Sequence, residues 1–155
     1  MIPDLEPVWK QFTETYEALR QALAEVPEDR LAWRPGPKAN TVAGIVQHIA
    51  RANIGYAHVM EHGERGPRWQ PEESPSRQWL LDRLDESAQR VRETFEWMPP
   101  ERLRQIRADR WGPLGPEVPG PLDALWFALQ MMRHSAYHLG QINVYLLLLE
   151  GESGQ

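Results

Sequence analysis

The chain has 155 residues, which suits one globular domain (residues 1–155), and its 41% hydrophobic and 25% charged residues exclude intrinsic disorder. Its formal net charge is -5 and no stretch is densely basic, which argues against a nucleic-acid partner. Because the chain has no cysteine, disulfides, thiolate metal sites and a cysteine nucleophile are all excluded.

The sequence shows no sign of export or of membrane insertion. Residues Met1 to Glu6 lack the basic and apolar regions of a secretory signal. The longest strongly apolar run, Val144 to Leu149, is too short to span a bilayer. We therefore expect a cytoplasmic protein with no membrane partner.

Apolar residues recur every three or four positions in the first two predicted helices. The first helix covers roughly residues 3–24. The second begins near Asn40 or Thr41, either of which can cap a helix N-terminus, and runs to about Glu61. His48 lies within the apolar stripe of this second helix. The stripe of the first helix consists of Leu5, Val8, Phe12, Tyr16, Leu19 and Leu23.

Two more helices are predicted in the second half of the chain. The third begins at Ser76 and ends before Pro99. The fourth runs from about Pro121 to Glu150, with Gly151 as its stop signal. Between them, residues 99–121 hold six prolines and three glycines, which predicts a long irregular connection. No alternation is long enough to predict a sheet. The fold class is therefore all-α, a four-helix bundle with a long connection between helices three and four.

Three histidines are the main candidates for chemistry. His134 and His138 are four residues apart, so on a helix their Cβ atoms lie roughly 5–6 Å apart on one face. Two such imidazoles can bind one metal ion, and His48 is a candidate third ligand from another helix. A lone histidine on an apolar stripe is more often a core residue bonded to a neighbour. Three inward-facing imidazoles, however, need several partners, and a shared divalent ion satisfies one nitrogen of each.

His58 and His62 have the same spacing but cannot share an ion with His48. They lie roughly 15 and 21 Å farther along the helix, at about 1.5 Å per residue. A solvated helix end is the favoured interpretation of this second pair, because imidazolium interacts well with the C-terminus of the helix dipole.

The residues between His134 and His138 argue against a metalloprotease of the zincin type, because no glutamate follows the first histidine. Imidazole suits zinc, nickel and iron alike, and copper as well, so the metal's identity stays open. An ion held by three neutral nitrogens keeps its full charge, and it lowers the pKa of a bound water or thiol.

Three segments resemble the DinB-like (DinB/YfiT) superfamily: Leu31–Pro35, Thr41–Ala50 and His134–Ile142. The resemblance covers nearly the whole chain. It implies a four-helix bundle, often dimeric, with a divalent metal site whose ligands here are His48, His134 and His138. Characterised relatives include S-transferases that use bacillithiol, mycothiol or glutathione, and a mycothiol-dependent maleylpyruvate isomerase.

This chain departs from the superfamily beside its last metal-ligand candidate. Tyr137 and Leu139 stand where many members have histidine and arginine. Any part that those neighbours play in recognising a thiol or substrate therefore does not transfer to this chain.

Three functions follow as alternatives. The first is a metal-dependent S-transferase that activates a low-molecular-weight thiol for a small-molecule substrate. Metal-assisted hydrolysis is the second, and it needs a carboxylate near the ion, for which Glu61 and Asp123 are the candidates. The third is a non-catalytic, metal-stabilised binding module.

A homodimer is expected in any case, with the run 146–149 as a place for the contact between the two copies. The candidates to line or support a pocket are Trp33, Arg133, Tyr137 and Gln141, although packing or a solvated surface explains each at least as well.

Overall fold

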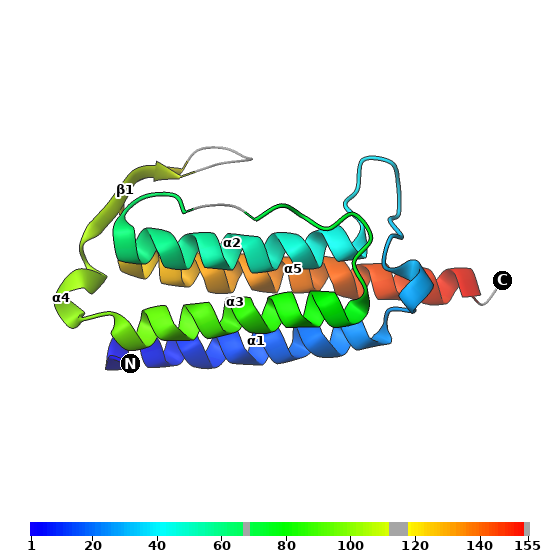
Figure 1. Ribbon diagram of the computed structural model, residues 1–155, viewed down its shortest axis with the longest axis horizontal. Helices are drawn as coiled ribbons and strands as arrows, with labels where there is room; N and C mark the ends of the chain where they lie inside the picture. The colour runs from blue at the N-terminus through cyan, green and yellow to red at the C-terminus, as the bar shows by residue number, and fades with distance from the viewer. Residues whose placement is uncertain (67–68, 112–117, 154–155) are drawn as a thin grey trace.

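The computed structural model describes residues 1–66, 69–111 and 118–153 and confirms the all-α four-helix bundle (Figure 1). The short turns η1 (Pro3–Leu5) and η2 (Glu28–Arg30) flank the first long helix, and the short helix α4 (Pro100–Leu103) follows the third. The long helices are α1 (Glu6–Glu25), α2 (Val42–His62), α3 (Arg77–Trp97) and α5 (Ala124–Ser153).

The helices are arranged in two parallel pairs. Figure 1 shows α1 and α5 running in one direction and α2 and α3 in the other. Helix α2 packs against α3 and α5, and α1 packs against both α5 and α3. Because α2 and α3 are consecutive and parallel, the chain between them must return along the bundle. The described residues of this return are 63–66 and 69–76, and we call them the strap. No helix in the described part of the chain combines the length and the apolar character needed to cross a bilayer.

Two predicted helix starts are confirmed and one is wrong. Thr41, not Asn40, caps α2, since its hydroxyl accepts a hydrogen bond from the Gly44 amide at 2.9 Å. Ser76 caps α3 by accepting from the Trp79 amide at 3.2 Å. The last helix begins at Ala124 instead of Pro121, because Asp123 accepts a bond from the Trp126 amide at 2.8 Å.

The predicted stop at Gly151 is also wrong, because α5 continues to Ser153. A glycine ends a helix well when its backbone turns to positive φ, as Gly63 does at the end of α2 with φ 76°. Gly63 is the only glycine with positive φ in the described part of the chain. Gly151 keeps the helical backbone instead, which costs stability but is allowed.

The expectation of no sheet was wrong. Strands β1 (Ile106–Trp111) and β2 (Val118–Asp123) pair antiparallel near the ends of α2 and α3, within the predicted irregular connection (Figure 1). The register shifts twice within this short ladder, so no alternating pattern survives in the sequence. The strands leave no room for a side chain at Gly120, where a Cβ atom would lie 2.3 Å from the carbonyl oxygen of Asp109. The part of the connection at 112–117 lies outside the described residues.

A buried polar network joins the four long helices inside a largely apolar core. Asn53 on α2 donates hydrogen bonds to the Tyr16 hydroxyl on α1 (2.8 Å) and to the Ser135 hydroxyl on α5 (2.9 Å). The Tyr16 hydroxyl also bonds to Ser87 on α3 at 2.7 Å, and Ser87 donates to the carbonyl of Leu84. Burial raises the pKa of Tyr16 to about 12, so its hydroxyl keeps its proton. The network therefore fixes the helices relative to one another.

We expect Tyr16→Phe to lower the free energy of unfolding by about 1–3 kcal/mol, because Asn53 and Ser87 each lose a buried partner. Urea unfolding of the purified variant measures this. The matched control is Tyr137→Phe, at a side chain that is 64% exposed, where the change should stay within about 0.5 kcal/mol. A Tyr16→Phe protein as stable as the wild type would show that the network contributes nothing.

Candidate metal centre

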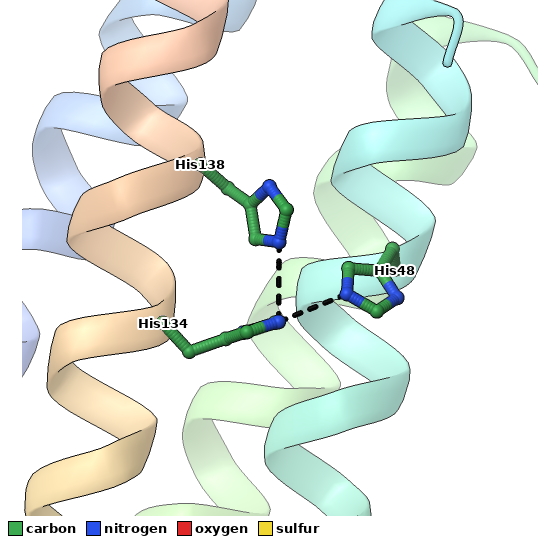
Figure 2. A group of neighbouring side chains, drawn as sticks. All are labelled: His48, His134 and His138. Atoms are coloured by element: carbon green, nitrogen blue, oxygen red, sulfur yellow. Dashed lines mark hydrogen bonds between the residues drawn. The ribbon is translucent and has the colours of Figure 1, made fainter. Parts of the chain in front are cut away.

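The three predicted histidines meet between α2 and α5. Figure 2 shows His48 of α2 facing His134 and His138 of α5. Nε2 of His134 lies 2.9 Å from Nε2 of His48 and 3.1 Å from Nε2 of His138. One ligand nitrogen from each ring lies within 4.8 Å of the others. In the described part of the chain, no other group of three metal-ligand side chains comes together.

The spacing of these nitrogens suits a metal ion. Ligands of a tetrahedral zinc with bonds of about 2.0–2.1 Å lie roughly 3.3 Å apart. The separations of Nε2 of His134 from its two neighbours, 2.9 and 3.1 Å, are close to that value, and all three ligand nitrogens lie within 4.8 Å of one another. Both contacts share Nε2 of His134, which carries either one proton or one lone pair, so this nitrogen cannot form a good hydrogen bond with both neighbours. A divalent cation accepts all three lone pairs, so the residues present fit a bound metal.

Burial keeps the imidazoles neutral, which is the form that binds metal. The pKa of His48 is lowered to about 4 and the pKa of His134 to about 3, mainly by loss of solvation and in smaller part by the neighbouring His138. Burial likewise lowers the pKa of His138. All three rings therefore offer unprotonated nitrogens at neutral pH.

Gln141 sets the orientation of His138. The Nδ1–H group of His138 donates to the Gln141 side-chain oxygen at 2.6 Å. The amide nitrogen of Gln141 in turn donates to the Tyr137 hydroxyl at 3.4 Å. With its proton on Nδ1, His138 presents the lone pair of Nε2 to His134 and His48. Partners of this kind fix the tautomer of histidines that bind metals.

The other pocket candidates take different places. The Tyr137 ring contacts His138, with ring centroids 5.1 Å apart, but most of the side chain faces solvent. Arg133 is exposed and donates to Gln130 at 3.0 Å. Trp33, in the loop before α2, packs edge-on against Tyr145 at 5.5 Å. Of the four, Gln141 alone holds one of the three histidines by a hydrogen bond.

The second histidine pair and the candidate carboxylates lie elsewhere. The rings of His58 and His62 contact each other at 4.4 Å and gain no third ligand among the described residues. Glu61 is bound by Arg90 and accepts a hydrogen bond from Thr94 at 2.6 Å. Asp123 caps α5. The three-histidine group thus contains no carboxylate.

Two residues beside the group, Arg51 and Gln47, are not among the candidates predicted from the sequence. Arg51 lies one helical turn after His48, and its guanidinium carbon lies 5.6 Å from the centre of the Trp69 ring on the strap. Gln47 fixes the strap, because it donates to the carbonyl of Glu72 at 3.0 Å and accepts from the Glu72 amide at 2.8 Å. The spacing of three residues from His48 is a sequence signal that could have identified Arg51. Only the path of the strap shows that Trp69 lies beside Arg51 and that Gln47 holds the strap.

Replacing a histidine of the group should abolish metal binding. We expect His48→Ala, His134→Ala and His138→Ala proteins to lose most of the metal that the wild type binds, whereas His62→Ala keeps it. Elemental analysis of tag-free protein, purified without added metal or chelator, measures the content per chain. Full retention in His138→Ala would contradict the assignment of the three ligands.

Replacing Gln141 should weaken metal binding without abolishing it. In Gln141→Leu, His138 loses the acceptor that fixes its tautomer, and we expect affinity to fall by about 10–100-fold. Gln141→Glu keeps an oxygen acceptor and should retain affinity near that of the wild type. Competition with a chromophoric chelator measures both constants. Equal affinity of Gln141→Leu and wild type would exclude this role.

Comparison with known proteins identifies the fold and the family. The family model of the DinB superfamily matches residues 11–142. A DinB-like protein of Bacillus subtilis is similar in structure, with TM-score 0.70 and 16% identity over 94% of this chain and 92% of the other. A conserved protein of Enterococcus faecalis gives TM-score 0.75 and 17% identity over 97% and 99%. A DinB-like protein of Bacillus cereus gives 0.72 and 16% over 95% and 93%. These structures show the shared fold, and no curated protein matches the chain. The chain belongs to the DinB superfamily.

Proposed function

We propose that this protein is a metal-dependent S-transferase that joins a low-molecular-weight thiol to an electrophilic small molecule. His48, His134 and His138 would hold a divalent zinc, nickel or iron ion. The observation that supports this most is the ligand set, three neutral imidazoles with no carboxylate among them. An ion bound by neutral ligands keeps its full charge and lowers the pKa of a thiol that reaches it.

The reaction needs no redox partner. The sulfur of the thiol forms a bond to carbon of the electrophile, the leaving group departs with the bonding electron pair, and the thiol proton goes to solvent. The chain supplies the ligands, and burial keeps them unprotonated. Gln141 holds the His138 ring in one tautomer. His48 and His134 are only half-buried, which supports access by a small molecule.

The alternatives have weaker support. A hydrolase needs a carboxylate beside the ion, yet Glu61 lies thirteen residues beyond His48 on α2, about 20 Å along the helix at 1.5 Å per residue. Asp123 precedes α5 by one residue, eleven residues before His134 and thus about 16 Å away. A purely structural metal site is usually closed by four protein ligands, whereas three ligands are typical of catalytic sites.

Our proposal includes a cytoplasmic location and a homodimer. The cytoplasm keeps thiols reduced, which a thiol-dependent enzyme requires. Helix α5 exposes apolar side chains near its C-terminus, which supports contact with a second copy there. These side chains are Val144, Leu147 and Leu148.

The direct test incubates metal-loaded protein with bacillithiol, mycothiol or glutathione and 1-chloro-2,4-dinitrobenzene, and follows the thioether by absorbance and mass spectrometry. We expect one thiol to react faster than its uncatalysed rate. His138→Ala should lose at least about 100-fold, because a bound ion contributes several kcal/mol of charge stabilisation. His62→Ala is the control and should keep the activity. No acceleration with any thiol, or full activity in His138→Ala, would overturn the proposal.

A further inference from the structure

Arg51 is placed to act on whatever binds at the histidines. It follows His48 by three residues on α2, so the two side chains are neighbours on one helix face, with Cβ atoms roughly 5–6 Å apart. Its positive charge contributes to the lowered pKa of His48, which agrees with this proximity.

The guanidinium of Arg51 is held by an aromatic platform. It lies over the Trp69 ring at 5.6 Å, a cation–π contact. Trp69 packs edge-on against Trp79 of α3 at 5.7 Å. The paired hydrogen bonds between Gln47 and the Glu72 backbone fix the strap that carries Trp69. The platform therefore restricts the side chain of Arg51 before any ligand arrives.

Arg51 has no counterion in the described part of the chain. Several other arginines of the bundle pair with carboxylates, as Arg20 does with Asp85 and Arg90 with Glu61. No carboxylate among the described residues pairs with Arg51, and its Nε–H group is buried without an acceptor. An arginine restrained in this way, beside a site for a divalent cation, favours an anionic ligand.

We propose that Arg51 binds a carboxylate of the molecule that occupies the metal site, so that the site selects thiols bearing a carboxylate. A guanidinium presents parallel N–H donors that match the two oxygens of a carboxylate. The inference rests on the proposed function only in naming the ligand a thiol. Arg51 would be a residue for substrate binding and specificity, and the chemical step would stay with the metal.

The experiment compares two thiols of similar size on the cobalt(II)-loaded protein, using its absorption spectrum to measure binding. The probes are 3-mercaptopropionate and the uncharged 2-mercaptoethanol. We expect the wild type to prefer the carboxylate probe by about tenfold, the effect of a charge-assisted hydrogen bond. Arg51→Gln should bind both equally, and Arg51→Lys should keep part of the preference. The matched control is Arg102→Gln. Arg102 also lies over a tryptophan, Trp97, at 5.1 Å, but this pair is at the C-terminal end of α3, whereas Trp79 lies near its N-terminal end.

The outcomes separate this inference from the proposed function. If both thiols bind but Arg51→Gln keeps the wild-type preference, or the wild type has none, the role of Arg51 is overturned and the thiol proposal stands. If neither thiol binds, the thiol proposal fails, and imidazole-4-acetate against 4-methylimidazole then tests Arg51 alone. A preference for imidazole-4-acetate that disappears in Arg51→Gln would support the carboxylate site, and equal binding would overturn it. Unchanged cobalt content in every arginine variant shows that the metal site is intact.

Discussion

The packing of α2 against α5 is the constraint on which the candidate site depends. These helices run in opposite directions, and their contact places His48 against two histidines from a single turn of α5. Nε2 of His134 lies 2.9 and 3.1 Å from its two neighbours, so a small shift of either helix would separate the group. Burial keeps the rings neutral, and neutral rings so close together are best satisfied by a shared cation.

The buried polar network supports this constraint from inside the core. Asn53 lies five residues after His48 on α2, and Ser135 directly follows His134 on α5; the two are joined by a hydrogen bond of 2.9 Å. Tyr16 and Ser87 extend the network to the remaining long helices. Apolar contacts tolerate sliding, whereas a hydrogen bond requires fixed atoms. The network therefore sets the helix register that brings the histidines together. Gln141 then fixes the orientation of the His138 ring.

Much of this arrangement could be predicted from the sequence, for physical reasons that also explain the errors. The spacing of apolar residues and the caps at Thr41 and Ser76 are local features, so the four helices can be predicted from them. The four-residue spacing of His134 and His138 likewise predicts that both lie on one face of the last helix. The hairpin at 106–123 escaped prediction because its register shifts remove the alternating pattern. The strap, and hence the pairing of Arg51 with Trp69, depends on chain direction, which no local pattern encodes. Gln141 was only one of several pocket candidates, because its role comes from a side-chain contact.

X-ray absorption spectroscopy of the zinc-loaded protein is the decisive experiment on the three-histidine site, because it counts the imidazole ligands around the ion. We expect three imidazole nitrogens at about 2.0–2.1 Å with one further light-atom ligand, and two imidazoles in the His48→Ala protein if any zinc remains. The three-histidine assignment would be wrong if the wild type showed fewer than three imidazoles or took up no zinc. It would also be wrong if the spectrum of the His48→Ala protein were the same as that of the wild type.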